Sequence, residues 1–154
     1  GIAWLEEPLP RHDYEGYARL RDAAEAPIAG GEFNDGPHEL YAFLDHDAVD
    51  VLQPDAALVT GIKRAVEVAG AARNQGVRFV PHTWTNAVGF AANLHVMAAV
   101  GADWCEFPME PPWTPAAWSA LIEGEFTADD GTVTPPTEPG LGVELNRDLL
   151  EGEE

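Results

Sequence analysis

Five ionisable side chains recur along the first 106 residues, each at the end of a short apolar stretch. They are Glu6, Glu32, Asp55, His82 and Glu106. If these stretches are parallel strands, their C-terminal ends meet on one face, which is the active-site face of an α/β barrel. Carboxylates gathered there repel one another unless a cation offsets their charge. Oxygen ligands suit a hard ion, so we expect Mg2+, with Mn2+ as the alternative.

His82 is the natural candidate for a general base, because the unperturbed pKa of histidine lies near working pH. Asp55 ends the preceding predicted strand and could accept a hydrogen bond from the imidazole ring and orient it. The alternative is a purely structural His–Asp pair at the rim of the sheet. Trp84 and Asn86 follow His82 in the same loop and are candidate substrate-binding residues. Asn86 could equally serve as the cap of the next helix.

Alternating apolar and amphipathic stretches indicate strands separated by helices. The predicted strands cover residues 2–5, 27–30, 49–53, 77–80 and 103–105. The predicted helices cover about 14–24, 37–44, 61–75 and 87–100. Asp13 and Thr60 stand where N-caps are expected. This order favours an α/β fold with five parallel strands and outer helices. Glu6 faces inward with Trp4, whereas Glu7 points the other way and is expected to be solvated.

The regular pattern stops after Pro108. Residues 1–108 are therefore assigned to strands and intervening helices, and residues 109–154 to a C-terminal helix and loop segment. Residues 115–121 form the predicted short helix. The following stretch, 125–142, is rich in Pro, Gly, Asp and Thr and is predicted to be loop or short strands.

Acidic residues dominate the charge, with 27 Asp and Glu against 8 Lys and Arg, a formal net charge of -19. Such a chain repels nucleic acid and anionic membranes, so both are excluded as partners. Because Lys63 is the single lysine, a halophilic protein explains this balance better than an ordinary acidic one. No apolar run approaches the roughly 20 residues that span a bilayer, and we expect a cytoplasmic protein. The single cysteine, Cys105, excludes an internal disulfide and is expected to be structural.

Several motifs together resemble the successive strand ends of the mandelate racemase group, in the mandelate racemase/muconate lactonizing enzyme family of the enolase superfamily. They are WLEEP (4–8), HDYEG (12–16), GGE (30–32), QPD (53–55) and PHTW (81–84). The resemblance implies that Glu6 and Glu32 are two of three carboxylate ligands to Mg2+. It also implies that Asp55 and His82 form the acid/base dyad. Glu106 would hydrogen-bond the substrate carboxylate as charge develops.

The activity implied by the resemblance is metal-dependent abstraction of the proton α to a carboxylate, which forms an enediolate. The stretches 90–95 and 104–108 resemble acid-sugar dehydratases more than aryl racemases. We therefore expect a Mg-dependent lyase that dehydrates a sugar acid, a 2,3-dihydroxy acid. The alternatives are a mandelate-type racemase or epimerase of a 2-hydroxy acid, and a non-catalytic half-barrel fragment. A cycloisomerase of the muconate type fits less well, because that group uses lysines where this chain has His82.

The same resemblance implies that the chain is the C-terminal portion of a TIM-type (β/α)7β barrel that begins in its fourth strand. The first three strands, the N-terminal capping domain, the third metal ligand and a second, lysine acid/base group would then be absent. Because such a piece has two open edges, we expect the N-terminal half in the same polypeptide or in another chain. The other expected partners are a small-molecule carboxylate substrate and further copies of the chain in a homo-oligomer.

Overall fold

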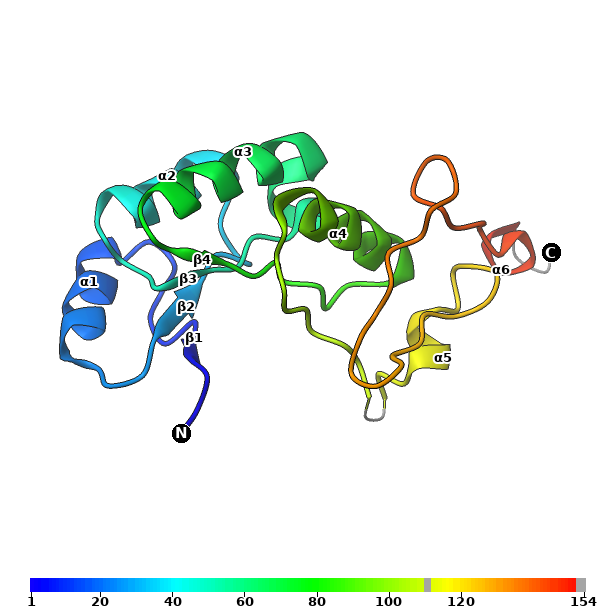
Figure 1. Ribbon diagram of the computed structural model, residues 1–154, viewed down its shortest axis with the longest axis horizontal. Coiled ribbons are helices and arrows are strands. Elements are labelled where there is room, and N and C mark those ends of the chain that lie inside the picture. The colour runs from blue at the N-terminus through cyan, green and yellow to red at the C-terminus, as the bar shows by residue number, and fades with distance from the viewer. Residues whose placement is uncertain (110–111, 152–154) are drawn as a thin grey trace.

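A small parallel sheet lies in the N-terminal half of the structure, a computed structural model that describes residues 1–109 and 112–151 (Figure 1). The strands lie in chain order, β1 (Leu5–Glu6), β2 (Ile28–Gly30), β3 (Val51–Leu52) and β4 (Arg78–Phe79). Each neighbouring pair is parallel, and Ala29 of β2 lies opposite Val51 of β3. The predicted α/β class and the parallel order of the strands are therefore confirmed.

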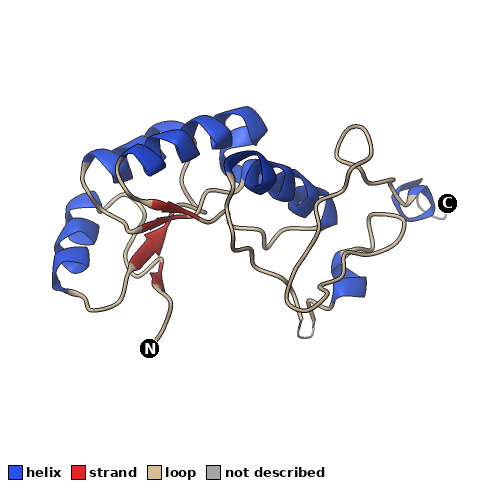
Figure 2. Ribbon diagram, in the orientation of Figure 1, coloured by secondary structure: helices blue, strands red, loops and turns tan. Residues whose placement is uncertain are grey.

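Helices follow each strand. The long ones are α1 (Tyr14–Ala23), α2 (Pro37–Asp45), α3 (Gly61–Asn74) and α4 (Ala87–Val100). The remaining ones are a π-helical turn, η1 (Ala56–Thr60), and two short helices, α5 (Pro115–Trp118) and α6 (Arg147–Glu151). The helices α2, α3 and α4 form a row in which α3 contacts both neighbours (Figures 1 and 2). Within the described ranges, none of these helices has the length and apolar character needed to cross a membrane.

The helix ends follow their local sequence in most places. Asp13 accepts a hydrogen bond from the backbone N–H of Gly16 at 2.9 Å and so caps α1 as predicted. Gly101 adopts the left-handed conformation, with φ 71°, that ends α4. The predicted cap Thr60 makes no side-chain bond to α3 and is wrong as a cap. Its backbone is already helical (φ -119°, ψ -32°), because η1 runs directly into α3, and an N-cap needs a non-helical backbone.

The main core lies between the sheet and α1 to α3. Its fully buried side chains include Tyr17, Leu40, Phe43, Leu52 and Val68. The opposite face of the sheet carries a small cluster of Ala29, Val51 and Val80, against which Trp4 packs. Because β2 and β3 are buried on both faces, they consist of apolar runs rather than alternating ones.

A second core joins α4 to the C-terminal segment. Phe90 of α4 packs edge-on against Trp118 and Phe126, with ring centroids 4.4 Å and 5.0 Å away. The helix α4 therefore contacts the main core on one side and this second core on the other, which explains why it is apolar around most of its circumference. The division of the chain at residue 108 stays a prediction.

The predicted fifth strand, residues 103–105, does not form, and this prediction is wrong for the described chain. The sheet contains β1 to β4, and no backbone hydrogen bond in the described residues joins 103–105 to β4. Side chains hold the segment there instead, since Arg78 pairs with Asp103 at 3.2 Å and lies 4.6 Å from the Trp104 ring centroid. The sheet is therefore open at this edge, and closure into a barrel stays a prediction.

Candidate active site

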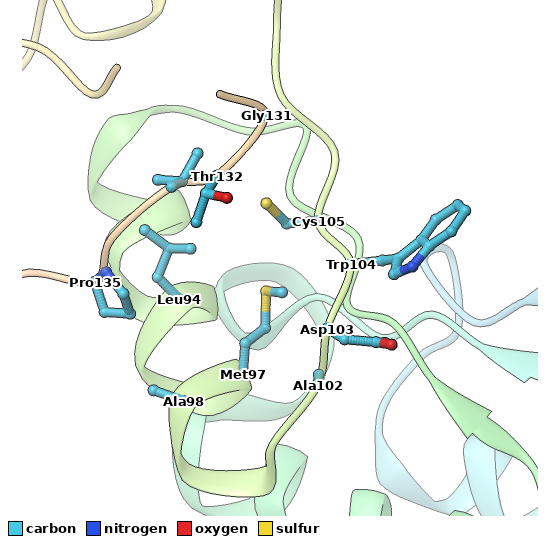
Figure 3. Close-up of a pocket in the computed structure, with 11 residues that line it drawn as sticks. Leu94, Met97, Ala98, Ala102, Asp103, Trp104, Cys105, Gly131, Thr132 and Pro135 are labelled. Atoms are coloured by element: carbon cyan, nitrogen blue, oxygen red, sulfur yellow. The ribbon is translucent and has the colours of Figure 1, made fainter. Parts of the chain in front are cut away.

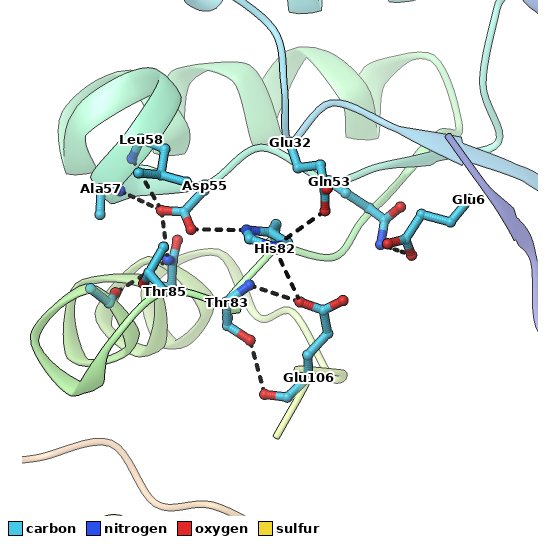
Figure 4. A network of polar contacts seen from close by, with 12 residues as sticks. Glu6, Glu32, Gln53, Asp55, Ala57, Leu58, His82, Thr83, Thr85 and Glu106 are labelled. Atoms are coloured by element: carbon cyan, nitrogen blue, oxygen red, sulfur yellow. Dashed lines mark hydrogen bonds and ion pairs between the residues drawn. The ribbon is translucent and has the colours of Figure 1, made fainter. Parts of the chain in front are cut away.

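His82 lies at the centre of a cluster of carboxylates at the C-terminal ends of the strands (Figure 4). Its Nδ1 is 3.0 Å from Asp55 Oδ2. Its Nε2 is 3.2 Å from Glu32 Oε2 and 4.0 Å from Glu106 Oε2. The structure thus brings together four of the five residues that were predicted from the strand ends, with one ring nitrogen facing Asp55 and the other facing two glutamates.

Asp55 is completely buried and is held by the turn that follows β3. Its Oδ1 accepts hydrogen bonds from the backbone N–H groups of Ala57 at 2.6 Å and Leu58 at 3.3 Å, so Asp55 is the N-cap of η1. An aspartate before a helical turn is a favoured cap, because its oxygen satisfies donors that the first turn leaves free. These two bonds to its own turn contribute to holding the Asp55 side chain, independently of its contact with His82.

Glu106 reaches the cluster although its segment forms no strand. Its Oε2 accepts a hydrogen bond from the backbone N–H of Thr83 at 3.0 Å. The Thr83 hydroxyl also donates to the Glu106 carbonyl oxygen at 2.9 Å. Both bonds come from the residue next to His82, so they link the loop after β4 to the 103–106 segment and keep Glu106 beside the ring.

Glu6 lies at the edge of the cluster and is oriented by two donors. Its Oε2 accepts from Gln53 Nε2 at 2.8 Å and from Trp4 Nε1 at 2.9 Å. Gln53 is buried, with an exposed fraction of 1%, and its Oε1 has no hydrogen-bond partner among the described residues. The bonds to one oxygen of Glu6 leave the other oxygen available for a further partner.

Burial and the charges of neighbouring groups shift the pKa values of Glu32, Glu106 and His82. Burial raises the pKa of Glu32 to about 7, and the charges of Glu6 and Glu106 add to this rise against the opposing effect of His82. Burial also raises the pKa of Glu106, although a backbone N–H bond opposes the shift. Burial lowers the pKa of His82, but the bond to Asp55 and the nearby glutamates outweigh it, so that the net shift is upward. The raised pKa values of Glu32 and Glu106 mean that their charged forms are disfavoured here, and a bound cation would favour those forms.

Glu6 and Glu32 are the predicted ligands of a divalent cation, and this assignment stays a prediction. The described residues contain no group of three or more His, Cys, Asp or Glu side chains arranged to hold a metal ion. Mg2+ commonly binds one or two carboxylates and completes its shell with water and substrate oxygens. The free oxygen of Glu6, the carboxylate of Glu32 and the unpartnered Oε1 of Gln53 are hard oxygen donors of the kind Mg2+ prefers. The residues present fit Mg2+ on these grounds, and the remaining ligands must come from elsewhere.

The prediction that Glu7 is a solvated loop residue is wrong. Its backbone is left-handed, with φ 42°, so the strand alternation on which the prediction was based no longer applies. Glu7 Oε1 accepts from the backbone N–H of Gly31 at 2.7 Å, and Oε2 accepts from the buried Tyr17 hydroxyl at 3.1 Å. Glu7 therefore has a structural role, because it ties β1 to the residue directly before Glu32.

Trp84 and Asn86 follow His82 in the loop that leads to α4. Asn86 Oδ1 accepts from the backbone N–H groups of Val88 and Gly89 at 3.0 Å and 3.1 Å, so the alternative prediction of a helix cap is confirmed. The Trp84 residue is 43% exposed. Their role in substrate binding stays a prediction, since neither residue shares a hydrogen bond with the carboxylate cluster in the part of the chain described.

A pocket of about 450 Å³ lies between α4, residues 102–105 and residues 131–135 (Figure 3). Cys105 lines it together with Leu94, Met97 and Pro135. Burial raises the pKa of the Cys105 thiol, which favours the unreactive protonated form. None of the predicted site residues lines this pocket, so we do not assign the chemistry to it.

Three residues that hold the cluster were not predicted from the sequence, namely Gln53, Thr83 and Asn93. Asn93 donates to Asp55 Oδ1 at 3.1 Å from the middle of α4. A signal for it was present, because an amide in an otherwise apolar helix needs buried partners. The bonds of Thr83 depend on a contact across 23 residues of chain, for which local patterns give no signal.

Comparison with known families gives a match over residues 1–149 to the model described as "Enolase C-terminal domain-like". The chain belongs to this family. A curated relative, the D-galactarolactone cycloisomerase of Agrobacterium fabrum, is 39% identical over 97% of this chain and 41% of its own length. The L-talarate/galactarate dehydratase of Salmonella typhimurium is 31% identical over 94% of this chain and 34% of its own length.

Solved structures of enolase-superfamily proteins have the same fold. A mandelate racemase/muconate lactonizing enzyme from Sulfitobacter has a TM-score of 0.85 and 32% identity over 97% of this chain and 37% of its own. The 3,6-anhydro-D-galactonate cycloisomerase from Zobellia galactanivorans has a TM-score of 0.83 and 32% identity over 97% of this chain and 42% of its own. The resemblance to this enolase C-terminal domain family is therefore confirmed, and the chain spans about two fifths of the length of these relatives.

Proposed function

We propose that this enolase C-terminal domain carries the base and part of the metal site of an enzyme that removes the proton α to a carboxylate of a sugar acid. The observation that carries the proposal is the two-sided environment of His82. Asp55 holds Nδ1 at 3.0 Å, while Nε2 faces Glu32 at 3.2 Å and Glu106 at 4.0 Å. A ring that donates from Nδ1 presents the lone pair of Nε2, as a general base requires.

The proposed roles of the residues follow from these contacts. His82 Nε2 takes the α-proton, and Asp55 keeps the ring in the Nδ1–H tautomer and stabilises the imidazolium that results. Glu106, whose pKa is raised by burial, is the proposed donor of a hydrogen bond to the substrate carboxylate as its negative charge grows. Glu6 and Glu32 would hold Mg2+, which offsets the second negative charge that the enediolate places on the carboxylate.

Dehydration of a 2,3-dihydroxy acid is the proposed overall reaction. After loss of the C2 proton, the electron pair forms a C2–C3 double bond, the C3–O bond breaks, and the 3-hydroxyl leaves as water. A general acid must supply the proton that this hydroxyl takes with it. The enol that remains then takes the 2-keto form. Two of the relatives support this choice, since their names are those of an L-talarate/galactarate dehydratase and an arabinonate dehydratase.

Cycloisomerisation is the second candidate. It is favoured by the 39% identity to a D-galactarolactone cycloisomerase and the 32% identity to a 3,6-anhydro-D-galactonate cycloisomerase. The same α-proton abstraction, applied to a lactone or an anhydro ring, expels the ring oxygen and opens the ring without loss of water. Racemisation of a 2-hydroxy acid and a non-catalytic fragment remain as further alternatives.

The remaining ligand and the second acid/base group are proposed to come from an N-terminal half, in the same polypeptide or in another chain. The test therefore uses the complete polypeptide with added Mg2+. Sugar acids, their lactones and anhydro acids are incubated with it, and the products are analysed by mass spectrometry. A product lighter by one water supports the dehydratase, and a product of unchanged mass with an opened ring supports the cycloisomerase.

The matched controls are His82→Asn, which removes the proposed base, and Asp55→Asn, which removes the orienting carboxylate and keeps side-chain size. We expect both to reduce turnover by several orders of magnitude, as loss of a base or of its orienting carboxylate does in other enzymes. Turnover that both variants retain would contradict the proposed function. No turnover of any sugar acid, lactone or 2-hydroxy acid by the complete polypeptide would favour the non-catalytic fragment.

A further inference from the structure

Asn93 is the polar residue of α4 that is completely buried, with an exposed fraction of 0%. An amide in so apolar a helix costs free energy unless its donors and its acceptor all find partners. The mechanism proposed above gives α4 no residue, so the presence of this amide calls for another explanation. The contact between Asn93 and Asp55 supplies this explanation.

The neighbours of Asn93 determine which way its amide points. The backbone N–H of Ala56 donates to Asn93 Oδ1 at 2.8 Å, so this atom is the oxygen. Asn93 Nδ2 donates to the Gly89 carbonyl oxygen at 3.2 Å and to Asp55 Oδ1 at 3.1 Å. A flipped amide would place an oxygen against both of these acceptors and an N–H2 group against a donor. The orientation is therefore set by three separate contacts.

Asp55 is held on one side by this arrangement. Its Oδ1 accepts from the backbone N–H groups of Ala57 and Leu58 and from Asn93, whereas its Oδ2 contacts His82 Nδ1 at 3.0 Å. Figure 4 shows Asp55 between these turn residues and the imidazole ring. The terminal torsion of an aspartate is soft, so a carboxylate without such bonds turns easily. Three donors on Oδ1 oppose this turn and keep Oδ2 directed at His82.

A simpler explanation is that Asn93 only satisfies the Ala56 N–H at the start of η1. That role needs the amide oxygen alone and gives no reason for the contact between Nδ2 and Asp55. We propose that Asn93 is a positioning residue that fixes the carboxylate of Asp55 and, through it, the Nδ1–H tautomer and the ring orientation of His82. The inference rests on the proposed function, in which His82 Nε2 takes the proton, but its first test needs no turnover.

The first test measures the tautomer of His82 by NMR in the complete polypeptide, labelled with 15N-histidine, at a pH where the ring is neutral. The chain described here has only five histidines, and a His82→Asn variant assigns the ring signals of His82. We expect the Nδ1–H form alone in the wild type. In Asn93→Asp, which keeps the oxygen that Ala56 needs but turns the donor into an acceptor, we expect a mixture with the Nε2–H form.

The matched control is Val96→Ala, on the same helix and at a site with the same 0% exposure, whose side chain has no polar atom that could bond to Asp55. It loosens the packing of α4 without changing a polar contact, so we expect the wild-type tautomer. A second variant, Asn93→Ser, is too short to reach Asp55 and carries no charge. If Asn93→Asp fails to fold, Asn93→Ser still tests the loss of the hydrogen-bond donor to Asp55.

The second test measures α-proton exchange of a sugar acid. Loss of a supporting hydrogen bond behind a functional group typically costs about 10–100-fold in activity. We therefore expect Asn93→Asp to lower kcat by a factor in this range with little change in KM, and Val96→Ala to keep the wild-type kcat. A purely structural role would instead make both variants alike.

The inference fails if Asn93→Asp and Asn93→Ser keep the pure Nδ1–H tautomer and the wild-type kcat. Failure of the proposed function gives a different result, in which His82→Asn exchanges the α-proton as fast as the wild type. If the proposed function fails in this way, or if no substrate is turned over, the tautomer spectra alone decide whether Asn93 orients Asp55 and His82.

Discussion

At the scale of single residues, the cluster around His82 is held by bonds that each carboxylate makes outside it. Asp55 is fixed by the N–H groups of η1, Glu106 by Thr83, and Glu6 by Gln53 and Trp4. Glu32 is the exception, because its carboxylate contacts the His82 ring itself. Its backbone is positioned instead by Gly31, the residue before it.

Gly31 leads to our first prediction. Its φ of 136° is one that residues with a side chain rarely adopt, and a Cβ there would lie 3.1 Å from the backbone nitrogen of Gln53. We expect Gly31→Ala to lower the free energy of unfolding by about 1–3 kcal/mol, because the strained backbone is forced against the next strand. Urea denaturation measures this change.

The control for Gly31 is Gly70, in the middle of α3, where a Cβ would meet nothing within 4 Å. Gly70→Ala should raise the free energy of unfolding by up to about 1 kcal/mol, because alanine is the better helix former. Equal effects at the two positions would contradict the close approach of β2 and β3 at Gly31.

At the scale of elements, the C-terminal segment supports the loop that carries His82. Trp118 of α5 is buried and its Nε1 donates to the carbonyl oxygen of Thr85 at 3.1 Å. The bond connects the loop between β4 and α4 to a helix 33 residues further along the chain. The second core, through Phe90 and Phe126, keeps Trp118 in this position.

Trp118→Phe is the second prediction. Phenylalanine keeps an aromatic ring in the second core but leaves the Thr85 carbonyl without its donor. An unsatisfied buried group costs about 1–3 kcal/mol, and because the Thr85 carbonyl is only partly buried we expect a loss of stability of about 1 kcal/mol. Hydrogen exchange of the amides in residues 83–86 should become faster. The same substitution at Trp113, which is 49% exposed, serves as control and should change stability by less than about 0.5 kcal/mol.

The turn before α2 gives a prediction about pH. Glu39 accepts from the backbone N–H of Asp35 at 2.8 Å and from Asn34 at 3.0 Å, and these bonds hold the pKa of Glu39 below its usual 4.5. A carboxyl group whose pKa is lower in the folded state stabilises the protein at any pH above its pKa in the unfolded state. This contribution is lost as the pH falls through its pKa in the folded state.

Glu39→Gln should therefore destabilise the protein at pH 7, by about 1 kcal/mol, and this difference from the wild type should shrink in acid. The control is Glu15→Gln, also in the first turn of a helix, whose side chain is 84% exposed and has one distant ion pair at 3.9 Å. Denaturation at neutral and acid pH measures both. If the loss of stability caused by Glu39→Gln increased as the pH fell, this would contradict the bonds assigned to Glu39.

Helix positions were predicted better than strand positions, for a physical reason. The helix α4 carries its own signals, an Asn86 cap and a Gly101 end, and it was predicted with the bounds that the structure has. A strand needs a partner, so its length depends on distant residues. Each strand is therefore shorter than its apolar stretch, and residues 103–105 form none. The π-helical turn η1 also lacked a signal, since it follows from the buried contacts of Asp55.

At the scale of the whole molecule, strand order explains why the site could be predicted and its supports could not. Glu32, Asp55 and His82 meet because parallel strands end at the same edge, a rule that needs only the sequence of elements. Glu106 joins them from a segment that forms no strand, through its bonds to Thr83. Gln53, Thr83 and Asn93 hold the cluster through individual hydrogen bonds between segments that are far apart in the sequence. Such contacts depend on side-chain packing, which no periodic pattern reports.

The excess of acidic residues gives a prediction for the whole chain. With a net charge of -19, repulsion among carboxylates opposes folding. Salt weakens this repulsion, because it shortens the Debye length from about 10 Å at 0.1 M to about 3 Å at 1 M. We expect the urea midpoint to rise as KCl increases to molar concentrations, which would support the predicted halophilic character. Sucrose, which is uncharged, is the control. A midpoint that KCl leaves unchanged or lowers would contradict this.

Solvent-deuterium exchange tests most directly whether His82 is the base. The complete polypeptide, with Mg2+, is incubated with sugar acids and related lactones in D2O, and proton NMR follows the signal at the α-carbon. We predict that this signal is lost, or that α-deuterated product forms, with the wild type but not with His82→Asn. Exchange at the wild-type rate in His82→Asn would contradict the role assigned to this histidine and the function built on it.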